Sequence, residues 1–179
     1  NKQQSNESRT TQRALIPRVG AVLTINKQIN VYGTWVKGFE PQSASVQSNP
    51  NTGAPFAPEQ SQLLEVGAKS DWFDHRLSIT TALFHLTKNN TLYNAGDAGN
   101  PDLLMQVGEE VSKGVEVDVA GELLPNWSVV VNYAYTDAKI TKTASGTEKD
   151  LGMQRPNTPR HAANIWTKYI LRHGPLRNL

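Results

Sequence analysis

Four ionisable residues fall on the polar sides of alternating runs in this chain: Glu65, Lys69, Glu116 and Asp118. From 115 to 119 every second residue is valine, and the two carboxylates stand between the valines. A β-strand with this spacing carries apolar side chains on one face and charged ones on the other. Such charges can pair across neighbouring strands or line a wet passage. The pattern therefore predicts a sheet whose two faces meet two different environments.

The residues needed for catalysis or for metal binding are dispersed. The four histidines, His75, His85, His161 and His173, show no spacing typical of metal ligands. Cysteine is absent, and no Gly-x-Ser-x-Gly motif occurs. We therefore predict no catalytic residue, no metal ligand and no resident cofactor in this chain.

Composition is compatible with a soluble protein and with a membrane β-barrel. The chain has 37% hydrophobic residues and a mean hydropathy of −0.50, values typical of a soluble protein. A membrane strand, however, needs an apolar residue only at every second position over roughly ten residues. No run is long enough for a membrane-spanning helix. The 18 basic and 16 acidic residues are balanced and scattered, which argues against nucleic acid as a partner.

The alternating runs group into hairpins. Residues 16–39, 63–87 and 104–138 are predicted as hairpins, the last with its turn at Pro125 and Asn126 and a bulge within 108–113. Residues 160–179 are predicted as a strand and the start of the next hairpin, and residues 1–15 as a polar lead-in. The segments 40–61, 88–102 and 139–159 are predicted as long loops, and the prolines of 40–61 indicate that it holds neither strand nor helix.

Long and short connections thus alternate strictly, which places all long loops at one edge of an up-and-down sheet. This asymmetry is typical of outer-membrane barrels. We expect an all-β fold, an antiparallel meander that forms a partial wall of an outer-membrane β-barrel, with aromatics such as Trp127 and Tyr135 near the ends of the lipid-facing columns. A soluble β-sandwich binding module with its valine faces between two sheets is an alternative. Both chain ends look cut, so we expect residues 1–179 to be a single partial domain of a longer protein.

Several segments carry a family resemblance over nearly the whole chain from Pro17. INVYGTWVKGFEPQS, LLEVGAKSDWFDHRLSITTALFHLTKNN, SKGVEVDVAGELLPNWSVVVNYAYTDA and TPRHAANIWTKYIL resemble the C-terminal half of TonB-dependent ferric-siderophore receptors, most closely the ferrichrome type. The resemblance implies a 22-stranded barrel filled by a plug domain in the outer membrane of a Gram-negative bacterium. It also implies import of a ferric siderophore, of the hydroxamate class, with energy from the TonB complex, so we expect a transporter and not an enzyme.

This chain contains no segment that resembles the plug, and it would supply seven or eight wall strands. The resemblance points to four aromatic residues in or near the external loops or on the upper lumen face as candidate siderophore contacts: Phe39, Phe56, Phe84 and Tyr93. They can equally pack within the loops or form an interface belt. The four charged residues named first would line the permeation path or pair with the plug, or simply solvate a polar lumen. A passive porin-like or adhesin barrel remains the alternative function.

Overall fold

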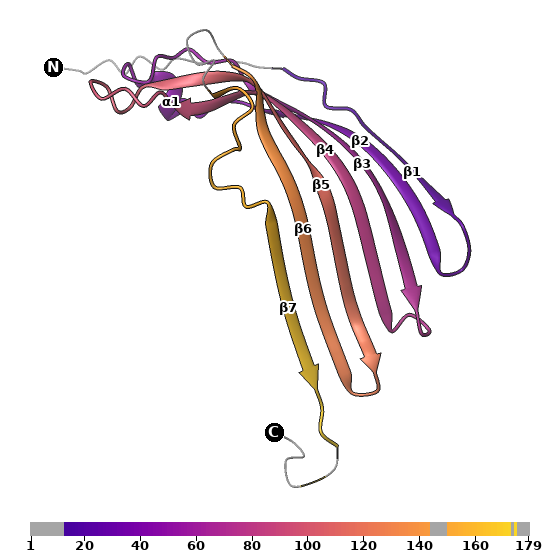
Figure 1. The fold of residues 1–179 in the computed structure, drawn as a ribbon. Coiled ribbons are helices and arrows are strands. Elements are labelled where there is room, and N and C mark those ends of the chain that lie inside the picture. Colours follow the sequence, from indigo (N-terminus) through magenta and orange to yellow (C-terminus); the bar gives the residue numbers. More distant parts are fainter. Residues whose placement is uncertain (1–12, 144–149, 173, 175–179) are drawn as a thin grey trace, which may run out of the picture.

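A computed structural model of the chain describes residues 13–143, 150–172 and 174. These residues form one antiparallel sheet of seven strands, in which spatial order follows sequence order (Figure 1). The strands are β1 (Arg18–Thr24), β2 (Ile29–Glu40), β3 (Glu59–Trp72), β4 (Leu77–Asn94), β5 (Leu104–Leu124), β6 (Trp127–Lys142) and β7 (His161–Tyr169). The predicted all-β meander is confirmed.

Long and short connections lie at opposite ends of the sheet, as predicted. The β1–β2, β3–β4 and β5–β6 turns lie together at the lower end in Figure 1, and the long connections lie at the upper end. The turn between β5 and β6 consists of Pro125 and Asn126, and Asn126 adopts a positive φ of 70°. Asparagine tolerates this left-handed conformation better than most residues, which suits it to the turn.

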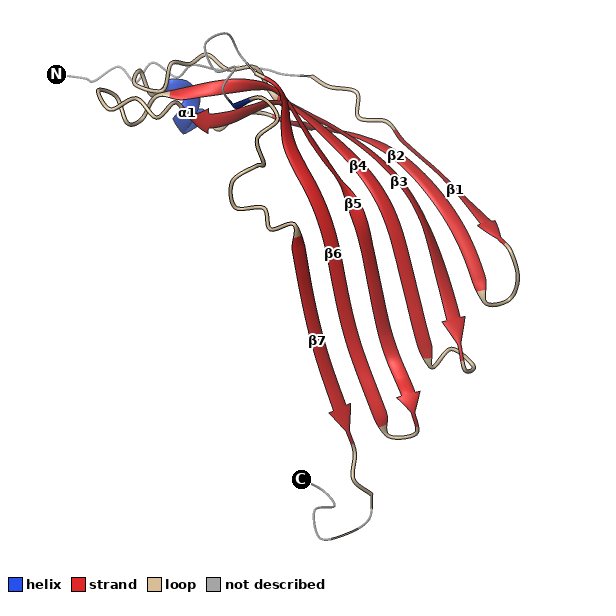
Figure 2. Cartoon of the chain, in the orientation of Figure 1, coloured by secondary structure: helices blue, strands red, loops and turns tan. Residues whose placement is uncertain are grey.

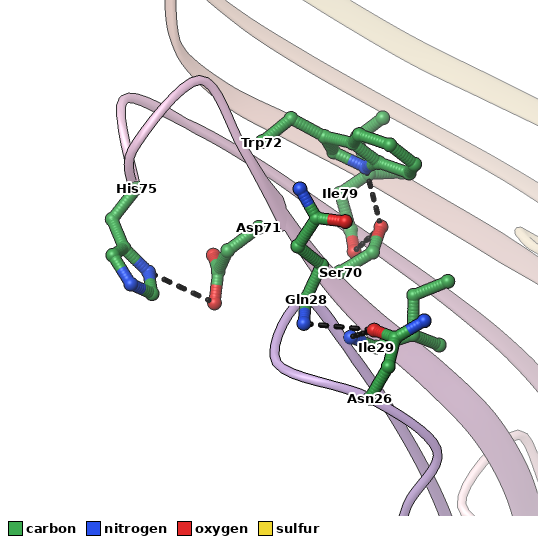
Figure 3. A network of polar contacts seen from close by, with 8 residues as sticks. All are labelled: Asn26, Gln28, Ile29, Ser70, Asp71, Trp72, His75 and Ile79. Carbon is green, nitrogen blue, oxygen red and sulfur yellow. Dashed lines mark hydrogen bonds and ion pairs between the residues drawn. The ribbon is translucent and has the colours of Figure 1, made fainter.

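Adjacent lower turns are joined by hydrogen bonds (Figure 3). The side-chain oxygen of Asn26 accepts from the backbone N–H groups of Gln28 and Ile29 at 2.8 and 2.9 Å, which closes the β1–β2 turn. The N–H of Asp71 at the end of β3 donates to the carbonyl of Gln28 at 2.9 Å. In the next turn His75 Nδ1 lies 3.6 Å from a carboxylate oxygen of Asp71. The turns at the lower end are therefore short, and hydrogen bonds satisfy the backbone N–H groups of Gln28, Ile29 and Asp71.

The upper end differs from prediction in two ways. A short helix, α1 (Ala44–Ser48), lies in the segment predicted to hold neither strand nor helix (Figure 2). The side chain of Ser43 caps it by accepting from Val46 N at 3.4 Å, and it ends before Pro50. The prediction was wrong because the segment between Pro41 and Pro50 is long enough to hold a helix of five residues.

Several strands are also longer than predicted. β3 begins at Glu59, β4 continues to Asn94 and β6 to Lys142, so the β4–β5 loop shrinks to residues 95–103. A register shift between β5 and β6 falls at Glu109 and Glu110, within the segment predicted to bulge. Most of the predicted lead-in (residues 1–12) and most of the turn expected after β7 lie outside the described residues.

Neither face of the sheet is covered by a second layer of the described residues (Figure 2). Within those residues only five apolar side chains are buried: Leu77, Ala82, Val129, Ala138 and Ile140. Large apolar side chains are instead exposed, with Leu83 at 61% and Ile165 at 71%. A water-soluble sheet buries such side chains against a second layer. This sheet therefore requires an apolar surrounding along one face.

Candidate functional site

The strand register brings the four predicted charged residues to one face, here called the inward face. Glu65 on β3 lies opposite Phe84 on β4, which lies opposite Gly114 on β5. Glu116 and Asp118 follow Gly114 at alternate positions of β5, so they share its face. Lys69 is opposite Thr80, which is opposite Asp118. The alternating positions carry the valines and form the outward face.

Tyr32 on β2 organises the first part of this charged surface. Its hydroxyl donates to Glu65 Oε1 at 2.8 Å, and the ammonium of Lys69 lies 5.5 Å from the centre of its ring. The ring lies over Gly67, since a Cβ there would come within 2.6 Å of two ring carbons and of the hydroxyl oxygen. Glycine therefore permits this close approach. Tyr32 thus contacts both charges, the Glu65 carboxylate through its hydroxyl and the Lys69 ammonium through its ring.

A second group of polar side chains lies toward β7. The side-chain amide of Asn132 on β6 donates to Asp118, and Glu116 lies on the same face. These residues border a shallow hollow of about 340 Å³ whose floor includes Ala134 and Ala162. Within the described part of the chain no group of three or more His, Cys, Asp or Glu residues could hold a metal ion. The inward face thus offers hydrogen bonds and negative charge to a partner.

The four candidate aromatics do not converge on a single site. Phe84 lies on the inward face beside Gly114, where a Cβ would meet its ring at 3.0 Å. Phe39 shares the outward face with Trp35, because the two are four positions apart on β2. Phe56 lies in the β2–β3 connection and Tyr93 on the upper part of β4. Within the described residues none of the four forms a ring–ring contact with another.

The side chain of Gln106 on β5 ties the β2–β3 connection to the upper part of β4. Its amide NH₂ donates to the carbonyls of Ala57 at 2.7 Å and Asn90 at 2.9 Å, and its oxygen accepts from Ala57 N at 3.2 Å. Two further bonds join the β2–β3 connection to the β4–β5 loop and to the start of β5, from Asn100 Nδ2 to the Asn51 carbonyl at 2.8 Å and from Leu104 N to the Thr52 carbonyl at 3.0 Å. We call residues 41–58, 95–103 and Gln106 the loop unit.

The loop unit fixes the surroundings of two candidate aromatics. The backbone of Phe56 exchanges two hydrogen bonds with the side chain of Gln47 on α1, at 2.7 and 2.9 Å. Tyr93 lies opposite Met105, next to Gln106, and its hydroxyl is buried without a hydrogen-bond partner. A buried hydroxyl without a partner is unusual and needs an explanation.

The outward face carries a continuous apolar band. From each lower turn upward, the outward positions of β2 to β7 hold only uncharged residues for four or five positions. On β5 they run from Gly121 to Val115, and on β6 from Trp127 to Tyr135. Eight to ten tilted residues match an apolar band about 25 Å tall. No described helix is long and apolar enough to cross a membrane.

Above this band lies a set of charges that face inward. Lys88 pairs with Glu59 at 2.7 Å, and Arg155 lies 3.6 Å from Glu110, which is 3% exposed. Burial raises the pKa of the Glu110 carboxyl, while the guanidinium of Arg155 opposes the shift. Next to Glu110 on β5, Glu109 pairs with Lys142 at 2.8 Å.

Sequence reasoning missed three residues of this site: Tyr32, Gln106 and Glu110. Tyr32 could have been found, because it is in phase with Thr34 and so faces the same side as Glu65. Gln106 gives no local signal, since its partner Ala57 lies 49 residues away. Glu110 sits at the bulge, where alternation no longer tells the two faces apart.

Comparison with known proteins identifies where such a wall occurs. The description "TonB dependent receptor-like, beta-barrel" matches residues 1–178. The chain is 32% identical to the metal-pseudopaline receptor of Pseudomonas aeruginosa, over 93% of this chain and 22% of that protein. It is also 32% identical to the ferrichrome outer membrane transporter/phage receptor of Escherichia coli, over 90% of this chain and 20% of that protein. The chain spans about a fifth of the length of these curated relatives.

Solved structures agree with the fold. The siderophore receptor PiuA of Acinetobacter baumannii superposes with a TM-score of 0.68 at 27% identity, over 85% of this chain and 23% of that one. The ferripyoverdine receptor of Pseudomonas aeruginosa gives a TM-score of 0.69 at 24% identity, over 90% and 21%, and supports the fold alone. The chain therefore belongs to the TonB-dependent receptor-like β-barrel family, whose members are outer-membrane receptors of Gram-negative bacteria and not enzymes.

Proposed function

We propose that the receptor to which this chain belongs captures a ferric siderophore, or a related metal–chelator complex, and imports it with energy from the TonB complex. The observation that carries the proposal is the family match over residues 1–178, since its relatives carry names such as metal-pseudopaline receptor and ferrichrome transporter. The geometry is compatible, because a polar inward face leads down from a structured loop unit at the outer end.

The finer proposal is that the ligand is a hydroxamate siderophore, as the resemblance to the ferrichrome type suggests. The comparisons do not favour one class of ligand, because a metal-pseudopaline receptor and the ferrichrome transporter are each 32% identical to this chain. Within the site, Tyr93 and Phe56 are the aromatics that we propose as ligand contacts. Both are anchored in or beside the loop unit, and the buried Tyr93 hydroxyl has no partner within the described residues.

Uptake of radioactive iron by cells that carry the full-length receptor as their sole siderophore receptor tests both levels. Ferric hydroxamates, ferric catecholates and a pseudopaline-type metal complex would be offered separately, with and without TonB. We expect uptake of one class only, and only with TonB present. Uptake of a catecholate alone would overturn the hydroxamate proposal and leave the transport proposal intact. Equal passage of all solutes without TonB would indicate the passive porin-like alternative.

We further propose that the inward carboxylates Glu65, Glu116 and Asp118 bind cationic side chains of the plug domain that the family implies. Only Lys69 balances them among the four predicted residues, so this surface offers net negative charge to a partner. The double variant Glu116→Gln and Asp118→Asn removes two charges and keeps the side-chain shapes. We expect it to weaken retention of the plug in the lumen, measured as faster amide exchange in the plug of the full-length receptor. Unchanged exchange would indicate that these carboxylates only solvate the lumen.

A further inference from the structure

Part of the connection between β6 and β7 pairs with β6 in the manner of a short extra strand. The N–H of Gly152 donates to the Ile140 carbonyl at 2.8 Å, and the N–H of Arg155 donates to the Ala138 carbonyl at 2.9 Å. We call residues 150–157 the latch segment. It lies beside the upper part of β6 and leads towards the start of β7 (Figure 1). Its backbone therefore fixes it against the wall above the apolar band.

Apolar packing contributes little to this arrangement. Leu151 and Met153, the two large apolar residues of the latch segment, are each 55% exposed. Gly152 and Asn157, which flank the paired part, adopt positive φ values of 79° and 58°. Glycine and asparagine tolerate this conformation better than other residues, so both ends of the paired part are turns. A segment with few buried apolar contacts can separate from its neighbour without unfolding the rest of the protein.

One ion pair with a buried carboxylate joins the latch segment to the wall. Arg155 Nε lies 3.6 Å from Glu110 Oε2 on β5. The Glu110 side chain is 3% exposed, whereas that of Arg155 is 39% exposed. The other carboxylate oxygen, Oε1, is buried and has no hydrogen-bond partner among the described residues. Because burial of an incompletely bonded carboxylate costs free energy, the ionised form of Glu110 is poorly accommodated while the segment is docked.

The other neighbours of Glu110 do not remove this cost. Lys88 lies opposite on β4, but its ammonium is bound to Glu59 of β3 at 2.7 Å. The neighbour on β6 is the apolar Ile140. Burial has the largest influence on the pKa of Glu110 and raises it. The cations of Arg155 and Lys88 oppose this shift, and the Glu59 carboxylate adds to it.

We propose that Glu110 makes the docking of the latch segment on β6 sensitive to pH, so that the segment is docked in acid and released as Glu110 ionises. The inference rests on the geometry of the upper wall and is independent of the siderophore. Release would uncover the outer end of the inward face beside the pair of Lys88 and Glu59.

The direction of the pH effect follows from the raised pKa of Glu110. An acid with a higher pKa in the docked form than in the released form binds its proton more tightly when docked. Docking is therefore strongest below the pKa of an exposed glutamate, and it weakens as the pH rises through the pKa of the docked form. Each unit between the two pKa values makes release about tenfold easier.

Amide hydrogen exchange of the purified full-length receptor in detergent, followed by mass spectrometry from about pH 5 to about pH 8, tests the proposal. Each rate is divided by that of a free peptide with the sequence of residues 150–160, which removes the pH dependence of the exchange chemistry. We expect the protection of the latch segment to fall several-fold as the pH rises, while residues 115–119 of β5 stay protected. Constant protection of the segment, or an equal fall in β5, would overturn the proposal.

A neutral variant with the same side-chain shape identifies the titrating group. In Glu110→Gln the protection of the latch segment should no longer change with pH. Glu109→Gln is the matched control, because it removes the neighbouring carboxylate, whose pKa is lowered by its hydrogen bond from Lys142. Glu109 stays ionised over this pH range, so its variant should behave as wild type does. A fall in Glu110→Gln as large as that of wild type would refute the role of Glu110.

Arg155→Gln tests the same device with Glu110 in place, and it remains informative if Glu110→Gln does not fold. Without the guanidinium the pKa of Glu110 should be higher still. The fall in protection should then be larger than in wild type and should continue to higher pH. Arg155→Lys keeps the positive charge and should stay close to wild type. A fall in Arg155→Gln that is equal to or smaller than that of wild type would overturn the proposal.

Discussion

The spanning wall and the loop unit differ in what holds their strands and segments in place. The wall is a continuous ladder of antiparallel backbone pairs, in which few side chains bond across strands. In the loop unit, amide side chains such as Gln106 and Asn100 bond to the backbone of segments about fifty residues away. The wall can therefore tolerate changes that preserve the polarity of each face, whereas the loop unit depends on individual side chains.

The largest expected effect comes from placing a charge in the apolar band. Val117→Lys on β5 puts an ammonium near the middle of the outward face, and we expect a loss of about 2–4 kcal/mol in the free energy of unfolding. The matched change Asn132→Lys faces inward beside Asp118 and should cost far less. Denaturant unfolding of the full-length receptor in phospholipid vesicles measures both. Equal losses would contradict the assignment of the two faces.

A methyl group at a close approach should have the next largest effect. In Gly114→Ala the new Cβ would lie 1.9 Å from the Tyr135 carbonyl oxygen, so β5 and β6 must move apart. We expect a loss of about 1–3 kcal/mol in unfolding free energy. Gly33→Ala is the control, because its Cβ meets only one backbone oxygen, at 3.8 Å. Similar stability of the two variants would show that the wall adapts more easily than its ladder suggests.

Loss of Gln106 tests the loop unit. Gln106→Ala removes three hydrogen bonds, and we expect a local loss of about 1–2 kcal/mol, because the amide is partly exposed. Amide hydrogen exchange should rise at Ala57 and over residues 95–103 while the wall is unchanged. Gln106→Glu keeps the acceptor for Ala57 N but sets a carboxylate oxygen against the carbonyls of Ala57 and Asn90, so its loss should be at least as large as that of Gln106→Ala. Gln62→Ala, which loses no described hydrogen bond, is the control; exchange that rises equally in both variants would contradict the role of Gln106.

The smallest effect is expected where the wall does use a side-chain hydrogen bond. Tyr32→Phe removes the bond to Glu65 but leaves the ring over Gly67, so we expect a loss of about 1 kcal/mol. The exposed Tyr169→Phe serves as a control and should change nothing measurable. Thermal unfolding of the two variants measures the change in stability of each. A loss as large as that of Val117→Lys would mean that the wall depends on single side chains after all.

The sequence was informative about the wall for a physical reason. Between a lipid phase and a wet lumen, alternate positions must differ in polarity, and the runs around Val117 and Val131 record that requirement. The same requirement disappears above the membrane, where both faces are wet. This is why Lys88 to Asn94 was predicted as loop although it continues β4. The opposite faces of Phe39 and Phe84 were readable from the alternation.

The loop unit could not be predicted in the same way. Its contacts join Gln106 to Ala57 and Asn100 to Asn51, pairs that are each 49 residues apart. No periodicity records such pairings, because they depend on how two loops of particular length meet in space. Helix α1 was hidden for a related reason, since the flanking prolines outweighed the Ser43 cap.

The register of the wall also fixes its inclination in the membrane. Ile29, the first residue of β2, is in register through β3, β4 and β5 with Val131, yet β6 begins four residues earlier, at Trp127. About one residue of stagger per strand, at ~3.3 Å rise and ~4.8 Å spacing, inclines the strands by roughly 35°.

Because the strands are inclined, residues at one depth in the lumen come from different rows of paired residues. Glu65 stands seven residues above the lower end of β3 at Trp72, and Glu116 eight above that of β5 at Leu124. The two carboxylates belong to different rows but share one level of the lumen. A solute or protein segment that descends along this wall would meet both carboxylates at the same depth.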